Sequence, residues 1–246
     1  MTDSLFFALG LGFLLGLKHA VEADHLVAVT TIVSEQRSVW RSARVGALWG
    51  VGHTASLLIA GVLVILLQVT IPARVASLLE FAVALMIIVL GTRILYLLLR
   101  NRRRVHLHSH THDGRAHTHL HFHEESDAHA PAKSHAHDEA PHKAFWGWRP
   151  LVVGMVHGLA GSALLTLFVL TEVVGQSGSR LLGLAYLLVF GIGSIGGMLL
   201  MSVLISLPFV FTAARFERVN TPIRLVTGIT SVAFGLYYAW ATSRGL

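Results

Sequence analysis

The segment His19-Ala-Val-Glu-Ala-Asp-His25 lies in the middle of an apolar run that extends from Leu5 to Val33. Ionisable side chains inside a bilayer cost roughly 2.5–3.5 kcal/mol each on insertion scales, so they are rare there without a partner or a task. Imidazole and carboxylate are also ligands that divalent transition metals take in proteins. The segment therefore predicts a membrane helix and a metal cation handled inside it.

The rest of the chain is also strongly apolar. Of its 246 residues, 54% are hydrophobic and only 13% are charged, where a soluble domain carries about 25% charged residues. About 20 apolar residues cross the ~30 Å of hydrocarbon in a bilayer as a helix. Six stretches are long enough, at about 4–32, 43–68, 75–99, 150–174, 181–207 and 222–242. We therefore expect an all-α, polytopic transmembrane protein of six helices.

Two features of composition exclude other classes. The chain has no cysteine, which excludes disulfides and thiolate metal sites. Its N-terminus carries Asp3 instead of a basic region, so we expect the first apolar run to remain as a helix and not to be cleaved as a signal peptide.

The basic residues indicate topology, and nucleic acid is not an expected partner. Fourteen of the 19 Lys and Arg residues lie in 35–44, 100–149 and 208–224, and only Arg74, Arg180 and Arg244 lie in the segments on the opposite side. The positive-inside rule then places both termini outside the cytoplasm and the central segment inside it. We expect a multi-pass protein of the cytoplasmic membrane.

Residues 101–144 break the apolar pattern and hold 12 of the 16 histidines. Such a polar, proline-containing stretch cannot bury a core, and we expect a disordered cytoplasmic loop. Its imidazoles are candidates for weak, dynamic metal binding. The alternative is a solvated linker whose composition has drifted without a role in metal binding. The candidate loop ligands are His106, His108, His110, His112, His117, His119, His121 and His123.

This loop separates two segments, 1–100 and 145–246, that resemble each other. Both contain Gly-x-x-His in their first predicted helix, and further matches follow in the same order. The matched elements are Gly16 to His19 with Gly154 to His157, Gly50-Val-Gly-His53 with Gly191-Ile-Gly-Ser194, and Leu90-Gly91 with Phe234-Gly235. A three-helix unit that occurs twice must enter the membrane from opposite sides. We therefore predict two inverted three-helix repeats, a plan typical of secondary transporters.

The candidate metal ligands are His19, Glu22, Asp24 and His25. On a regular helix His19 and His25 are separated by ~9 Å of rise, and Asp24 points about 100° away from His25. A straight helix cannot close all four groups on one ion. Either the helix is broken near the motif, or its ligands serve consecutive positions along a path.

Two histidines elsewhere are further candidates. His53 stands among small residues that allow close helix approach, and His157 corresponds to His19 in the second half. Packing alone is the alternative for both. Glu22 has an alternative too, because it lies four residues after Lys18 and can form an ion pair with it. Arg93 is expected to pair with a carboxylate or to extend to the cytoplasmic interface.

Lys18-His-Ala-Val-Glu-Ala-Asp-His-Leu26 resembles the signature of the nickel/cobalt transporter superfamily, with Glu22 in place of an Asp. Gly52-His53-Thr54 is similar to that family's second motif, and the six-helix order looks most like its short, urease-accessory-type branch. The resemblance implies passage of Ni²⁺ or Co²⁺ as substrate, with no resident cofactor. It makes the chain a permease and not an enzyme. A cytosolic metallochaperone is a candidate partner; the oligomeric state and the direction of transport stay open.

Three other functions compete with this interpretation. A transporter of Zn²⁺ or Mn²⁺ would use similar ligands. A b-type haem electron-transfer protein would use His19 and His157 as axial ligands, but it leaves Asp24 without a role. An intramembrane metallohydrolase is the third, although the chain has no His-Glu-x-x-His motif.

Overall fold

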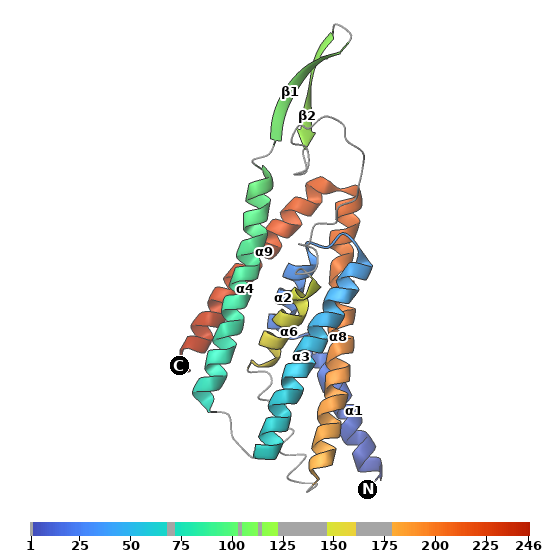
Figure 1. Ribbon diagram of the computed structural model, residues 1–246, viewed down its shortest axis with the longest axis vertical. Helices are drawn as coiled ribbons and strands as arrows, with labels where there is room; N and C mark the ends of the chain where they lie inside the picture. Colours follow the sequence, from blue (N-terminus) through green and yellow to red (C-terminus); the bar gives the residue numbers. More distant parts are fainter. Residues whose placement is uncertain (1, 68–71, 103–104, 113–114, 123–146, 161–178) are drawn as a thin grey trace, which may run out of the picture.

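The computed structural model describes residues 2–67, 72–102, 105–112, 115–122, 147–160 and 179–246. The elements in chain order are α1 (Thr2–His19), α2 (Ala23–Val33), α3 (Val39–Leu67), α4 (Ala73–Arg102), β1 (Val105–His112), β2 (Arg115–Phe122), α6 (Arg149–Gly158), α8 (Arg180–Arg215) and α9 (Glu217–Ser243). The helices form an elongated bundle, with the strands beyond one end and the N-terminus at the other (Figure 1).

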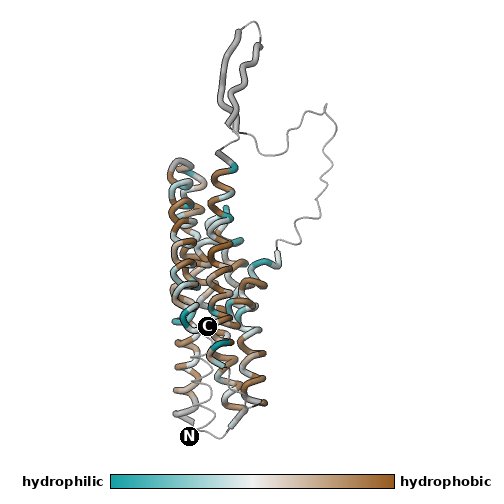
Figure 2. The backbone as a smooth tube through the Cα atoms, turned by 90° about the vertical axis from the view of Figure 1, so that its left-hand side faces the viewer, coloured by the Kyte–Doolittle hydropathy of each residue, from teal (hydrophilic) through white to brown (hydrophobic). Residues whose placement is uncertain are grey.

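The described helices confirm a multi-pass membrane protein. Three of them, α3, α4 and α8, are long and apolar enough to cross a membrane, and the bent pair α1 and α2 is apolar enough when taken together, as a broken span or a re-entrant loop. Hydrophobic residues continue along most of the bundle (Figure 2). Of the predicted fourth span, 150–174, residues 161–174 lie outside the described residues, so the total of six spans stays a prediction.

The first predicted span is broken at the ligand motif. α1 ends at His19 and α2 begins at Ala23, with an angle of 55° between them. Glu22 is extended, with φ −64° and ψ 150°. Its backbone N–H donates to the carbonyl of His19 at 3.1 Å, closing a tight turn. The broken-helix alternative is therefore correct.

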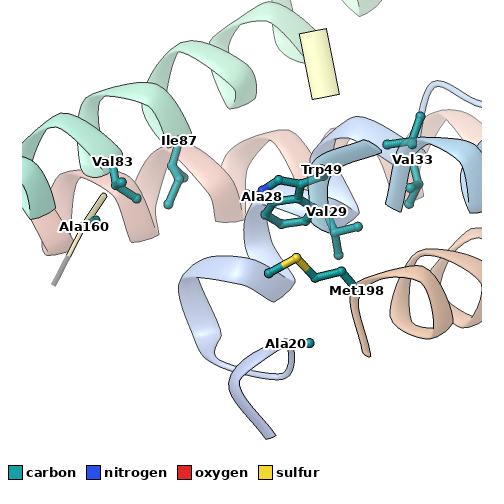
Figure 3. Close-up of a cluster of buried hydrophobic side chains, with 10 residues drawn as sticks. Ala20, Ala28, Val29, Val33, Trp49, Val83, Ile87, Ala160 and Met198 are labelled. Atoms are coloured by element: carbon teal, nitrogen blue, oxygen red, sulfur yellow. The ribbon is translucent and has the colours of Figure 1, made fainter. Parts of the chain in front are cut away.

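Helix contacts between the two halves hold the bundle together. α1 packs on α8, α3 packs on both α6 and α8, and α4 packs on α9. Glycines allow the closest approaches, since a Cβ added at Gly16 would overlap the carbonyl of Phe190, and one added at Gly154 would overlap that of Trp49. A buried apolar cluster surrounds the helix break and includes Trp49 and Met198 (Figure 3).

Residues 105–112 and 115–122, within the segment for which the sequence predicts disorder, form the antiparallel strands β1 and β2, which Figure 1 shows beyond the end of α4. Disorder of the segment as a whole stays a prediction, because the described residues cover only part of it. His106 pairs with His121, His108 with His119 and His110 with His117. The reason is local, because His alternates with other residues at the two-residue period of a strand, and Asp113-Gly114 between the strands is a dipeptide typical of hairpin turns. The chain is therefore not purely α-helical.

Candidate metal site

All four histidines outside 101–144 converge on one place. They come from four helices: His19 from α1, His25 from α2, His53 from α3 and His157 from α6. Each is at most 3% exposed. The ring centroids of His25 and His157 lie 4.2 Å apart, those of His19 and His25 lie 4.5 Å apart, and those of His19 and His53 lie 4.9 Å apart. Sequence positions 138 residues apart thus contribute to a single buried cluster.

The helix break makes this cluster possible. His19 is the last residue of α1 and His25 stands in the first turn of α2. The 55° bend brings their rings into edge contact at 4.5 Å, where a straight helix would separate them by ~9 Å of rise. The break contains neither Pro nor Gly, and its residues Ala20, Val21 and Glu22 are ordinary helix formers or neutral. Tertiary packing determines its position.

Asp24 connects the two halves of the chain through its carboxylate. One oxygen, Oδ1, accepts a hydrogen bond from the ring Nδ1 of His25 at 3.1 Å, and also one from the His25 backbone N–H at 3.0 Å. The other oxygen, Oδ2, lies 2.9 Å from Nε2 of His157. The side chain is 13% exposed. Such a carboxylate orients both imidazoles and is itself within reach of an ion held between them.

His19 has a partner on each ring nitrogen. Its Nε2 lies 3.0 Å from Nε2 of His53, and its Nδ1 lies 3.1 Å from the carboxylate of Glu22. Glu22 is the most accessible of the candidate ligands, with its side chain 41% exposed. It therefore pairs with His19, and no ion pair with Lys18 occurs among the described residues.

Two groups of donor atoms lie close enough together to be candidates for holding a metal ion. The triads, His19 with His25 and His53, and Asp24 with His25 and His157, each offer three ligand atoms within 4.8 Å of one another. Nitrogens bound about 2.1 Å from one metal at angles of 90–109° lie about 3.0–3.4 Å apart, and the 3.0 Å between His19 and His53 is within this range. Buried nitrogens are almost always hydrogen-bonded, yet three have no partner among the described residues: Nε2 of His25, Nδ1 of His53 and Nδ1 of His157. A bound cation would satisfy such groups.

Trp49 is a residue of this cluster that sequence reasoning missed. Its indole stacks on His25, with 5.7 Å between centroids and 19° between planes, and lies 5.6 Å from the ring of His157. In the sequence it is one apolar residue among many in a membrane helix. Only its place one turn before His53 hints at a shared face.

A cavity of about 910 Å³ lies next to the cluster, between α2, α3, α4 and α6. It is lined by Thr31, seven residues after Asp24 on α2, and by Val153, one turn before His157 on α6. Its polar edge is an ion pair in which Nη1 of Arg93 lies 2.6 and 2.7 Å from the two carboxylate oxygens of Glu35. The expectation that Arg93 pairs with a carboxylate is confirmed. Glu35 itself was missed, because it follows the apolar run and has no motif around it.

His123, the last of the candidate loop ligands, lies outside the described residues.

Comparison with known proteins shows the family of this chain. Residues 5–227 match the NicO family, described as high-affinity nickel-transport protein. The chain belongs to the NicO family. It is 35% identical over 235 residues to the urease accessory protein UreH of Bacillus sp. (strain TB-90), covering 94% of this chain and 90% of that one. A 58-residue stretch is 48% identical to the chloroplast protein FOR GROWTH AND FERTILITY 1 of Arabidopsis thaliana, and covers 23% of this chain and 16% of that protein. No solved structure matches.

Membership of the NicO family confirms three predictions: the family resemblance, a metal-transport function and a protein that is not an enzyme. The haem alternative finds no support in the geometry. The ring of His25 packs against both His19 and His157, at 4.5 and 4.2 Å, which leaves a haem plane no space between the two proposed axial ligands.

Proposed function

We propose that this NicO protein is a permease of the cytoplasmic membrane that moves Ni²⁺ or Co²⁺ through the histidine cluster by alternating access. The observation that carries the proposal is the convergence of four buried imidazoles and the carboxylate of Asp24 at a helix break. Imidazole with carboxylate suits several divalent first-row ions. The family match favours nickel as cargo, and Zn²⁺ and Mn²⁺ are the competitors to be tested.

Two inverted three-helix repeats form the scaffold in this proposal. This scaffold is supported by close contacts between the halves that occur twice. In each pair, a residue of the first half makes the same contact that its counterpart in the second half makes. Phe190 lies 5.6 Å from the ring of His19, as Trp49 lies 5.6 Å from that of His157. The matched close approaches of glycines to residues of a facing helix are Gly16 on Phe190 with Gly154 on Trp49, Gly193 on Phe13 with Gly52 on Leu151, Gly50 on Ile195 with Gly191 on Thr54, and Gly91 on Gly228 with Gly235 on Ala84. A scaffold of this symmetry can rock one half against the other around a central site.

The proposed topology places both termini outside the cytoplasm and 101–144 inside it. The basic residues that flank the spans support this orientation. In Figure 1 the two termini lie away from the end that carries β1 and β2. The histidine-rich segment would then collect or release metal on the cytoplasmic side, where a cytosolic metallochaperone is a candidate partner.

The cavity beside the cluster is the cytoplasmic half of the pathway in this proposal. Thr31 lies ~10 Å along α2 from Asp24, so the cavity wall begins within two turns of the ligands. The ion pair between Arg93 and Glu35 stands farther along the same wall. An ion leaving the imidazoles would pass this carboxylate before reaching the loop.

Flux of radiolabelled Ni²⁺ and Co²⁺ into and out of cells or proteoliposomes tests the proposal. Replacing His19 or His25 by Ala should abolish flux in protein that still inserts. Ser202→Ala removes a buried hydroxyl of α8 that faces Gly46 and belongs to neither donor triad, and it should leave flux unchanged. Protons should compete with the metal, because an imidazole must be neutral to bind it, so uptake should fall as the pH is lowered. Excess Zn²⁺ and Mn²⁺ measure selectivity. Normal flux in both histidine variants would remove the proposal.

A further inference from the structure

We infer that the histidine cluster is two overlapping metal stations, of which one is filled at a time. The inference rests on the proposed function, and it divides the proposed metal site into two ion positions, which we call stations. The first station consists of His19, His25 and His53, and the second consists of Asp24, His25 and His157. His25 belongs to both.

Each station has its own close contacts. In the first, Nε2 of His19 lies 3.0 Å from Nε2 of His53, a separation that fits two nitrogens on adjacent coordination positions. In the second, the carboxylate of Asp24 lies 2.9 Å from His157 and 3.1 Å from His25. Both sets combine borderline nitrogen donors with a nearby carboxylate, since Glu22 adjoins the first and Asp24 is part of the second.

The four imidazoles cannot all hold one tetrahedrally coordinated ion in this arrangement. The centroid of an imidazole lies about 3.2 Å from a metal it binds, so two rings at adjacent positions on one ion are about 4.6–5.3 Å apart, and only rings on opposite sides of the ion reach about 6.4 Å. The centroids of His53 and His157 are 6.4 Å apart. The two rings are therefore too far apart for adjacent positions on one ion, and we assign them to different ion positions.

The two nitrogens of His25 differ in their surroundings. Nδ1 lies beside Asp24 of the second station, whereas Nε2 is buried without a hydrogen-bond partner among the described residues. A neutral imidazole carries one lone pair and one N–H at a time. When Nδ1–H donates to Asp24, only Nε2 can bind metal, and when Nδ1 binds metal, Nε2 carries the hydrogen. An ion at one station thus excludes an ion at the other.

The stations also differ in the helices they need. The first is built by α1, α2 and α3 of the first half alone, whereas the second joins α2 to α6 of the second half. Movement of one half against the other would open or close the second station and leave the first intact. The ion would exchange His19 and His53 for Asp24 and His157 as it advances.

Co²⁺ binding to the purified full-length chain tests the division, because the visible spectrum of Co²⁺ reports its ligands. All variants carry Asn in place of the 12 histidines of 101–144, so that only the cluster binds. In this background His53→Ala should retain the second station and His157→Ala the first. Each should bind one Co²⁺ per chain with affinity reduced about tenfold or more and with different spectra, and neither should transport. His25→Ala should lose both stations, and Ser202→Ala should match the parent. Asp24→Asn is the substitute if His157→Ala does not yield folded protein.

The outcomes separate the two proposals. One Co²⁺ per parent chain, with distinct spectra in the two single-station variants, supports the stations. Complete loss of binding in both His53→Ala and His157→Ala would mean a single site, and two Co²⁺ per parent chain would mean that His25 is not shared; either result overturns the stations while transport by the unmodified chain still stands. A parent chain that neither binds nor transports Ni²⁺ or Co²⁺ overturns the proposed function as well.

Discussion

Gly16 of α1 lies against the carbonyl of Phe190 in α8, and Gly154 of α6 lies in the same way against that of Trp49 in α3. The ligands around these matched contacts differ. His53 reaches to 3.0 Å from His19, but its counterpart in α8 is Ser194, whose buried hydroxyl has no hydrogen-bond partner among the described residues. The halves thus share their packing and not their chemistry. The comparison suggests that symmetry serves the movement of the scaffold, while the ion depends on an asymmetric set of ligands.

The largest expected effect comes from removing that asymmetry. His53→Ser gives the first half the residue that the second half already has, and it should lower Ni²⁺ flux by about 100-fold or more, since changes even to the partners of metal ligands cost 10–100-fold. Ser194→Ala removes the matching hydroxyl and should change flux less than twofold. Initial rates of ⁶³Ni uptake measure both. Equal losses in the two variants would mean that the second half also supplies a ligand here.

Adding a Cβ at the matched helix contacts should lower the stability of the protein by a similar amount in either half. Ala at Gly16 or at Gly154 places a Cβ onto facing backbone, and overpacking of this kind costs about 1–3 kcal/mol. Ala at Gly10 or Gly196, where nothing lies within 4 Å of the added atom, should be neutral or slightly stabilising because Ala favours helix. Thermal unfolding in detergent measures the difference. If only one of Gly16 and Gly154 tolerates Ala, the two interfaces are not equivalent.

Breaking the ion pair at the cavity should reduce flux less than the loss of His53 does. This ion pair also has no counterpart in the other half. Arg93 has Tyr237 as its counterpart in α9, so the second half carries no matching charge. Arg93→Gln leaves the part-buried Glu35 without this partner and should reduce flux several-fold, corresponding to about 1 kcal/mol for a pair this accessible. The double variant Glu35→Gln with Arg93→Gln should recover part of the loss. No recovery would indicate that Glu35 itself contacts the ion.

The smallest effect on transport should come from deleting 105–142, the segment between the halves. Because both sets of cluster ligands lie outside it, maximal flux should be preserved. The concentration of metal that gives half-maximal flux should shift, since the loop histidines no longer collect ions. Flux measured over a range of Ni²⁺ concentrations separates the two parameters. Loss of maximal flux in correctly inserted protein would make the segment part of the pathway.

The sequence identified the ligands of the cluster better than their partners. Histidines and carboxylates inside apolar runs are costly there, so His19, Asp24, His25, His53 and His157 could be selected from composition alone. The spacing of His19 and His25 also required either a break in the helix or ligands that serve consecutive ion positions along a path. It could not tell that Asp24 would bridge His25 to His157, because that contact joins residues 133 positions apart and depends on how α2 meets α6.

The errors have physical causes as well. Glu35 follows an apolar run without any motif, and only the tertiary fold shows that Arg93 lies beside it. The hairpin was missed because the polar composition of 101–144 outweighed its local pattern. Every second residue from His106 to His112 is a histidine, which matches the period of a strand, and Asp113-Gly114 is a dipeptide typical of hairpin turns.

The ends of two helices at the cluster have an electrostatic consequence. α1 ends at His19 and α6 ends at Gly158, directly after His157. The C-terminus of a helix carries the equivalent of about half a negative elementary charge, from carbonyl groups that lack a partner within the helix. Two such ends meet at the cluster, and Asp24 offsets the positive N-terminal end of α2. The two helix C-termini, together with the carboxylate of Asp24, therefore make this buried place attractive to cations and repellent to anions before any ion binds.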